Sequence, residues 1–430
     1  MKMKKFMSVV LTAAMATGLL AGCGSSSTGS SSSTTTSEAS TSTAEAAGST
    51  AAAADANGEV KATGDGPTFK IGAIGPLTGA AAQYGQGVVW GAEEAVKEIN
   101  AAGGINGYQI EYKGEDDELD NEKSVNAYNT LKDWGMQMLV GSTTSACSIA
   151  VSERTKADSM FQLTPSGSAA DCVKYDNVFR VCFADPAQGT KSAEYIAKNK
   201  LAENVGIIYD SSDVYSSGIE AAFVKEAEKQ GLKVSVEEAF TADSNTDFTA
   251  QLQKCKDAGV DLVFLPIYYT QAATILTQAD TLGLDAKYFG CDGLDGMLDM
   301  KNFNKELAEG VMLLTPFSAT ATDDATQKFV AAFKADHDQT PNQFAADAYD
   351  AIYAIKAAAE KENVTPDMSV ADIEAALAKG MTEVTVEGLT GTITWQASGE
   401  PDKEPKAVVI KDGAYEMMES TSEATSSTAA

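Results

Sequence analysis

Residues Lys70–Asn106 have the sequence KIGAIGPLTGAAAQYGQGVVWGAEEAVKEINAAGGIN, and this stretch decides the fold class. Its first part, Lys70–Ile74, is mostly apolar and predicts a short strand, and a Gly/Pro/Thr loop follows over 75–79. Apolar residues then recur at helical spacing and predict a long amphipathic helix: Val88, Ala92, Ala95, Val96 and Ile99. Gly103 and Gly104 are expected to end it. The stretch is therefore the opening strand–helix unit of a layered α/β domain, and its loop lies where open α/β sheets bind ligands.

The same alternation of strand and helix continues along the chain. Strands are predicted at Tyr108–Lys113, Met136–Val140, Met160–Leu163, Val205–Tyr209, Lys233–Glu237, Val260–Pro266, Lys287–Phe289 and Val311–Leu314. Helices are predicted at Glu122–Trp134, Ser145–Ala157, Val214–Gln230, Asp247–Ala258, Gln271–Leu282, Asp323–Ala335, Gln343–Lys361 and Val370–Ala378, before two strand-like segments, Gly391–Trp395 and Ala407–Lys411. Roughly eight such units exceed what one open sheet usually holds, so two doubly wound α/β lobes with a cleft between them are expected.

The chain is strongly acidic, with 61 Asp and Glu residues against 32 Lys and Arg residues and a net charge of −29. A surface this negative repels nucleic-acid phosphates and anionic lipid heads, so nucleic-acid binding is not expected. Much of the charge is expected to serve solubility alone.

The N-terminus has the pattern of an export signal. Residues 1–22 begin with lysines, continue with a short apolar run and end in Leu-Ala-Gly before Cys23. This box resembles the lipoprotein cleavage site of bacteria and implies a lipid anchor on Cys23; a secretory signal with an incidental cysteine is the alternative. Residues 23–66 are expected to form a disordered Ser/Thr/Ala tether behind the lipidated cysteine, and residues 419–430 a similar tail.

Five further cysteines carry no metal or redox spacing, because no two of them form a C-x-x-C pair. A disulfide between Cys172 and Cys182 and a set of buried free thiols both remain open. The five are Cys147, Cys172, Cys182, Cys255 and Cys291.

Nothing in the sequence argues for catalysis. The single histidine, His337, lies in a polar segment and is expected to be exposed at a helix end. No zinc-protease or P-loop motif occurs, and Gly72, Gly75 and Gly79 do not fit a dinucleotide fingerprint.

Small hydroxyl residues instead gather at predicted strand ends. Residues 142–145 precede a helix, whose free N–H groups and dipole favour a carboxylate, although Ser145 is equally suited to be a plain N-cap. Residues 166–168 add donors at the next strand end, and Asp292 follows a third strand, where it is placed to hold a cation. This pattern indicates an exported, two-lobed binding protein.

From Phe69 to about Lys411 the chain resembles the branched-chain amino acid (Leu/Ile/Val) binding proteins of bacterial ABC transporters, which have the type I periplasmic-binding-protein fold. The resemblance rests on IGPLTGAAAQYGQGVVWGAEEAVKEINAAGGING at 74–107, Glu-Asp-Asp at 115–117, LVGSTTSACS at 139–148, QLTPSGS at 162–168 and FGCDG at 289–293.

By these motifs the resemblance implies a site for the two charged groups of an amino acid. Ser145 and the Ala146 N–H correspond to donors to the carboxylate, and the Ser166–Gly167–Ser168 turn to partners of the ammonium and carboxylate. Asp292 corresponds to the counter-ion of the ammonium. Four aromatic residues correspond to the second lobe's contribution and the pocket walls: Tyr84, Tyr215, Tyr268 and Phe344. The family often has Glu at position 292 and Thr at 168, so the side chains here are shorter in reach. Trp90 either narrows the pocket or belongs to the core.

The resemblance also implies lobe bounds and partners. The N-terminal lobe is expected to comprise 67–186 plus 317–390 and the C-terminal lobe 187–316 plus 391–418, with a three-stranded hinge crossing near Pro186, Pro316 and Thr390. A monomer on the outer face of the cell membrane is expected to deliver a neutral amino acid to an ABC permease and its ATPase, with no cofactor or metal. An amide, urea or aromatic-acid binder and a sensory module are the alternatives.

Overall fold

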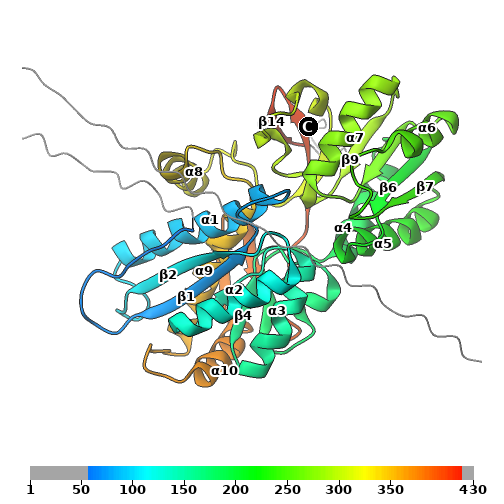
Figure 1. The fold of residues 1–430 in the computed structure, drawn as a ribbon. Helices are drawn as coiled ribbons and strands as arrows, with labels where there is room; N and C mark the ends of the chain where they lie inside the picture. The colour runs from blue at the N-terminus through cyan, green and yellow to red at the C-terminus, as the bar shows by residue number, and fades with distance from the viewer. Residues whose placement is uncertain (1–56, 419–430) are drawn as a thin grey trace, which may run out of the picture. The chain divides into compact units, whose positions relative to one another are not determined.

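The structure, a computed structural model, describes residues 57–418 (Figure 1). The predicted signal peptide, Cys23, most of the predicted tether and the tail lie outside the described residues. No helix between residues 57 and 418 is long and apolar enough to cross a bilayer.

Residues 57–60 lie on the edge of a sheet, although the sequence places them in the tether. Val60 exchanges two main-chain hydrogen bonds of 2.9 Å with Tyr112, and the Gly114 N–H donates to the Asn57 carbonyl. Composition does not reveal this pairing, because main-chain bonds to an edge strand need no apolar side chains.

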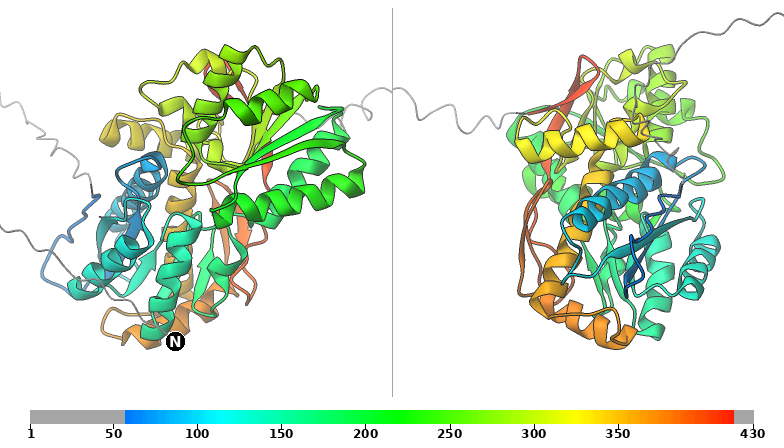
Figure 2. Two further views of the ribbon diagram at one scale, coloured as in Figure 1. Left: turned by 45° about the vertical axis from the view of Figure 1, so that its right-hand side comes forward. Right: turned by 90° about the vertical axis from the view of Figure 1, so that its left-hand side faces the viewer.

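The first sheet has five parallel strands in the order β2-β1-β3-β4-β5. These are β1 (Phe69–Gly75), β2 (Ile110–Asp116), β3 (Met138–Val140), β4 (Phe161–Thr164) and β5 (Val178–Arg180). The helices packed with it are α1 (Ala82–Ala101), α2 (Asn121–Trp134), α3 (Ser145–Asp158), α9 (Gln343–Lys361) and α10 (Val370–Met381). Figures 1 and 2 show α1 running along α9 on one face of this sheet.

Side chains from both faces of the first sheet are buried. Ile71 and Ala73 of β1 pack into the cluster that contains α1 and α9 residues, whereas Ile74 packs with residues of α2 and α3. Because successive strand side chains point to opposite faces, this division shows a sheet covered by helices on both sides.

The second sheet has seven strands in the order β14-β13-β10-β9-β8-β6-β7. These are β6 (Val205–Asp210), β7 (Val234–Phe240), β8 (Leu262–Leu265), β9 (Lys287–Gly290), β10 (Met312–Thr315), β13 (Lys406–Lys411) and β14 (Ala414–Met417). β13 pairs antiparallel with both of its neighbours, β10 and β14, and all other neighbouring pairs are parallel. Its helices are α4 (Asp185–Lys198), α5 (Val214–Gln230), α6 (Thr249–Asp257) and α7 (Tyr269–Leu282). The expected two-lobed α/β fold is confirmed.

The described chain crosses three times between the lobe of the first sheet and the lobe of the second. The first crossing lies between β5 and α4, the second follows β10, and the third precedes β13. Pro186 is in the first turn of α4, and Pro316 follows β10 directly. After β10 the chain forms α8 (Asp324–His337), which packs on α1. Near the third predicted crossing lies a hairpin of β11 (Thr385–Gly388) and β12 (Gly391–Thr394), which packs on α9.

Helix ends follow their capping residues. Asp120 and Asp213 accept hydrogen bonds from first-turn N–H groups of α2 and α5, and Gly135 and Gly231 end these helices with positive φ values of 95° and 70°. Asp213 and Gly231 explain why α5 has the predicted bounds. The predicted start of α9 is set by Asn342, whose side chain accepts a hydrogen bond from Ala345 N. The strands β5, β11 and β14 were not predicted, because each is only three or four residues long. Helix α4 was not predicted either, because the sequence around Pro186 indicates a crossover between lobes.

The packing of side chains tests the expectations for His337 and for the cysteines. The prediction that His337 is exposed is wrong: its side chain is 1% exposed and stacks on Trp90 at a centroid distance of 4.7 Å, with Nε2 3.3 Å from a Glu94 carboxylate oxygen. Trp90 therefore belongs to the packing of α1 against α8. All five described cysteines are buried free thiols, which is one of the two alternatives left open.

Asp350 of α9 is expected to anchor the β11–β12 hairpin. Its buried carboxylate accepts hydrogen bonds from Leu389 N, Thr390 N and Thr390 Oγ1. Asp350→Ala leaves these donors unpaired, at a cost of about 1–3 kcal/mol for each that stays buried. We therefore expect urea denaturation to show a loss of about 2–4 kcal/mol. The control Asp133→Ala removes an exposed carboxylate of α2 and should leave the midpoint nearly unchanged. An equal midpoint for the two variants would contradict the anchoring role.

Candidate functional site

The predicted site residues gather at the carboxyl ends of the strands of both sheets. A small cavity of about 20 Å³ has ten lining residues, and seven of them were predicted from the sequence: Tyr84, Ser145, Ser166, Tyr215, Tyr268, Asp292 and Phe344. The other three are Thr143, Thr144 and Gly293. Of the remaining predicted residues, Ala146 lines a larger cavity that shares Thr144 and Tyr268 with the small one, and Gly167 and Ser168 lie in the turn that contacts Ser145.

The N-terminus of α3 presents hydrogen-bond donors to the cavity. Thr144 occupies the N-cap position but makes no side-chain cap, and the first turn contains no acidic residue. The hydroxyl oxygen of Ser145 accepts from both Ser168 N and Ala169 N at 3.1 Å. Because these bonds occupy its acceptor positions, the Ser145 proton is left to donate to a ligand. The arrangement favours an anionic group at this end of the cavity.

The turn at 164–169 is held rigid by buried hydrogen bonds. Ser166 Oγ donates to the Thr143 carbonyl at 2.6 Å, and Gly167 N donates to Thr164 Oγ1 at 2.8 Å. The guanidinium of Arg180, fully buried, donates to the carbonyls of residues 167, 168 and 169. Ser168 Oγ is buried without a hydrogen-bond partner, so its hydroxyl is available to a ligand.

Asp292 supplies a buried carboxylate from the second sheet. It begins a 3-10 turn after β9, and its side chain accepts a 2.7 Å hydrogen bond from the Tyr215 hydroxyl. Its N–H donates to Gln188 Oε1. Burial raises the pKa of Asp292 to about 6, although the hydrogen bonds from Tyr215 and Gln188 oppose the rise. A carboxylate in this state is stabilised by a cation placed beside it.

Asp185 is a second buried carboxylate that the sequence analysis did not identify. Asp185 is 1% exposed, and neither of its carboxylate oxygens has a hydrogen-bond partner. Burial raises its pKa well above the ordinary value; the nearby Ser168 hydroxyl and the charge of Arg180 oppose this rise, and the charge of Asp292 adds to it. The sequence signal was Asp185-Pro186, because Pro in the first turn is typical of a helix start.

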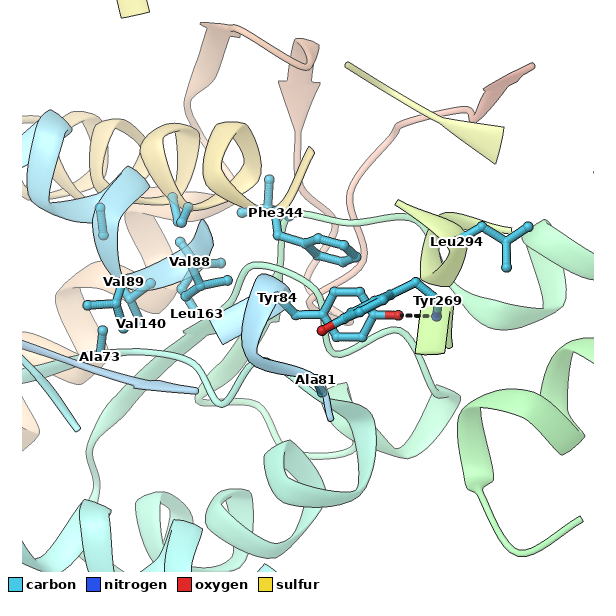
Figure 3. Close-up of a cluster of buried hydrophobic side chains, with 14 of the residues drawn as sticks. Ala73, Ala81, Tyr84, Val88, Val89, Val140, Leu163, Tyr269, Leu294 and Phe344 are labelled. Carbon is cyan, nitrogen blue, oxygen red and sulfur yellow. Dashed lines mark hydrogen bonds between the residues drawn. The ribbon is translucent and has the colours of Figure 1, made fainter. Parts of the chain in front are cut away.

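Aromatic side chains enclose the cavity between these groups. The Tyr84 ring lies 4.6 Å from that of Phe344 and 5.3 Å from that of Tyr268, measured between centroids. Its hydroxyl donates to the Gly293 carbonyl at 2.5 Å and accepts from Tyr269 N at 3.1 Å. Figure 3 shows the second of these bonds and the ring of Phe344 beside Tyr84. Tyr84, from α1, thus bonds to residues of the second sheet's body.

The described residues offer no cluster of three or more His, Cys, Asp or Glu side chains that would hold a metal ion. His337 belongs to the packing of α8 on Trp90, and none of the residues that line the small cavity beside Ser145 is a histidine. The cavity combines hydroxyl and N–H donors at one end with the Asp292 carboxylate at the other. This is the arrangement that a zwitterion requires.

Comparisons with known proteins agree with this geometry. A family described as periplasmic binding protein matches residues 68–412. The Leucine-, isoleucine-, valine-, threonine-, and alanine-binding protein of Pseudomonas aeruginosa is 31% identical over 71% of this chain and 81% of its own length. The Leu/Ile/Val-binding protein homolog 3 of Brucella melitensis is 30% identical over 77% of this chain and 88% of its own. A solved branched-chain amino acid transporter substrate binding protein from Streptococcus pneumoniae, in complex with isoleucine, is 28% identical with a TM-score of 0.74 and covers 81% of this chain and 98% of its own.

Replacing Asp185 tests whether its unpartnered carboxylate costs stability. A buried acid with a raised pKa contributes stability below its unfolded pKa and loses it as pH rises toward the folded pKa. Asp185→Asn does not titrate, so we expect its melting temperature without ligand to exceed that of the parent protein at pH 8 by a few degrees. That difference should shrink at pH 5.

Asp324→Asn is the matched control, because Asp324 is the exposed first residue of α8 as Asp185 is the buried first residue of α4. Thermal unfolding of the three proteins at the two pH values makes the comparison. A lower melting temperature for Asp185→Asn at pH 8 would show that the carboxylate is stabilising and would contradict this account.

Proposed function

Because this chain belongs to the Leu/Ile/Val-binding proteins of the periplasmic binding protein family, we propose that it captures a branched-chain or other hydrophobic amino acid between its lobes. The proteins of this family bind solutes and are not enzymes, and they act outside the cytoplasm. We further propose that the chain delivers its ligand to the permease and ATPase of an ABC importer. The observation that carries the proposal is the pairing of an uncapped helix N-terminus with the buried carboxylate of Asp292 across one cavity.

The ligand carboxylate is proposed to bind at the start of α3. Ser145 Oγ and the main-chain N–H of Ala146 are the donors, and Ser168 Oγ is a third. Hydrogen bonds to charged groups contribute about 1.5–3 kcal/mol each, and they strengthen when the lobes exclude water.

The ligand ammonium is proposed to lie between Asp292 and Asp185, with the Ser166 carbonyl in the turn beside them. The charge of Asp292 raises the pKa of the buried Asp185 carboxyl, so the two groups repel each other when both are ionised. An ammonium removes this repulsion, and Asp185 compensates for the shorter reach of Asp292 relative to the Glu that is common in the family. Ligands without an ammonium, such as aromatic acids, amides or urea, leave both carboxylates uncompensated.

The aromatic walls are proposed to hold the side chain and to couple binding to lobe closure. Tyr84, Tyr215, Tyr268 and Phe344 surround the cavity, and Tyr84 contacts both bodies. A cavity of about 20 Å³ holds no amino acid unless these rings and the lobes move apart. We therefore propose that the ligand enters an open form of the protein and that the lobes then close about the three crossings. The permease is proposed to detect this closed form. The proposed lobes comprise residues 67–186 plus 317–390 and residues 187–316 plus 391–418.

We also propose that the mature protein is a lipid-anchored monomer. Residues 1–22 would be the signal peptide, Cys23 the lipidated residue and the following residues the tether to the membrane. Metabolic labelling with palmitate should mark the parent protein, and Cys23→Ala should remove the label and move the protein from the membrane to the soluble fraction. A labelled Cys23→Ala protein would exclude this anchor.

The amino-acid assignment is tested by a calorimetric screen of the purified full-length protein against the twenty amino acids, urea, small amides and benzoate. We expect binding of isoleucine, leucine or valine. Asp292→Ala should weaken it by at least tenfold, because a charge-assisted contact is lost and Asp185 alone must bind the ammonium.

Asp257→Ala is a control at another aspartate of the second lobe, which is exposed at the end of α6 and lines neither the small nor the larger cavity. It should affect isoleucine binding far less. Binding only of ligands that lack an ammonium would exclude the amino-acid assignment, and a response to none of the compounds would exclude the function.

Affinity for the amino acid should also depend on pH. Because burial raises the pKa of Asp292 to about 6, this carboxyl takes up a proton as the pH falls through 6 and then cannot pair with an ammonium as an anion. We expect the dissociation constant for isoleucine to rise severalfold between pH 7.5 and pH 5, measured by calorimetry in buffers of equal ionic strength. The Asp292→Asn variant should lose most of this dependence; an unchanged profile in that variant would assign the titration to another group.

A further inference from the structure

A larger cavity of about 490 Å³ adjoins the small one, and most of its lining residues have no part in the proposed function. Thr144 and Tyr268 line both spaces, so a ligand held in the small cavity lies next to the large one. The large cavity is formed by loops after β2 and β6, the start of α3 and the start of α7. It is therefore placed to receive whatever extends from the amino acid past Thr144 and Tyr268.

The charged residues that line this cavity are all acidic: Asp120, Glu122, Asp210 and Asp213. Two of them have fixed positions, because Asp120 caps α2 and Asp213 caps α5. Burial raises the pKa of Asp213 to about 6, and the neighbouring charge of Asp210 adds to the rise. The carboxylates of Asp210 and Asp213 repel each other, and a cation beside them would lower the free energy of the pair.

Two unpartnered polar atoms give independent evidence for a ligand that donates hydrogen bonds. Thr144 is only 5% exposed and its Oγ1 has no hydrogen-bond partner. Gln271 Oε1, at the start of α7, is likewise buried without a partner. A branched aliphatic side chain satisfies neither atom, whereas an ammonium or guanidinium group carries several donors.

We propose that this cavity is a side-chain subsite for a cationic group, so that the protein binds basic amino acids of the lysine and arginine type in addition to branched-chain ones. The proposal rests on the proposed function, since the α-carboxylate and α-ammonium occupy the small cavity in both cases. The methylene chain of the ligand packs along Tyr268, and its terminal cation lies among Asp213, Asp210 and Gln271. Long cationic side chains bury their stems against apolar surface in this way.

The test measures affinities of the purified full-length protein for isoleucine, lysine and norleucine by calorimetry. Norleucine has the same carbon chain as lysine without the terminal ammonium, so the ratio of the two affinities reports on the charge alone. We expect lysine to bind at least tenfold more tightly than norleucine. In Asp213→Asn the ratio of lysine to isoleucine affinity should fall at least tenfold.

Asn is an equally good N-cap, so Asp213→Asn removes the charge and retains the start of α5. The matched control is Asp323→Asn, which makes the same change at the N-cap of α8, outside both cavities. The ratio should be unchanged in that control.

The outcomes separate the two proposals. If isoleucine binds and lysine binds no better than norleucine, the cationic subsite is excluded and the proposed function stands. An unchanged ratio in Asp213→Asn, with lysine still bound tightly, would also exclude this cavity as the subsite. If no amino acid binds, the proposed function fails first.

Discussion

The hydroxyl of Tyr84 links the two lobes, and the geometry of the cleft depends on it. This one group, carried on α1 beside the first sheet, donates to the Gly293 carbonyl and accepts from the Tyr269 N–H. Tyr269 begins α7 and Gly293 lies in the 3-10 turn after β9, so both partners belong to the second sheet's body, and the Tyr84 ring packs on Phe344. In the proposed mechanism the lobes cannot separate without breaking these bonds, so the same residue that forms the pocket wall also sets the free energy of opening.

The loop that carries Asp292 is tied to the first lobe by a second set of contacts. Asp295 accepts a hydrogen bond from Gln343 N, and Gln343 Nε2 donates to the Asp292 carbonyl. Gln343 begins α9 and directly precedes Phe344. Gln343 therefore connects the carboxylate of Asp292 with the aromatic ring of Phe344. We expect a ligand that displaces one of these two residues to move the other as well. Asp295 is only 4% exposed, and this burial raises its pKa to about 7.

The sequence predicted the long helices and most parallel strands because their signals are local. Asp213 and Gly231 define α5 through capping alone, and α9 has the predicted bounds because its apolar periodicity and its N-cap Asn342 agree. The sequence gives weaker signals for elements and side chains that are stabilised by contacts with residues distant along the chain. β5 is three residues long and is stabilised by neighbours such as Gly399, whose carbonyl accepts from Arg180 N. His337 is buried by a stack on Trp90, some 250 residues away along the chain, which no local pattern reveals.

In the candidate site too, some residues could be predicted from local sequence motifs and others could not. The residue that was missed carries a charge. Seven of ten residues expected from motif resemblance line one cavity, but Asp185 was missed because burial without a partner is a property of the fold and not of the residue. The net charge of −29 also acquires a meaning that composition alone did not give it. A zwitterion such as isoleucine carries no net charge and is not steered by this field, whereas a basic amino acid is attracted to it and meets further carboxylates at Asp210 and Asp213. Long-range attraction and the acidic cavity therefore favour the same class of ligand.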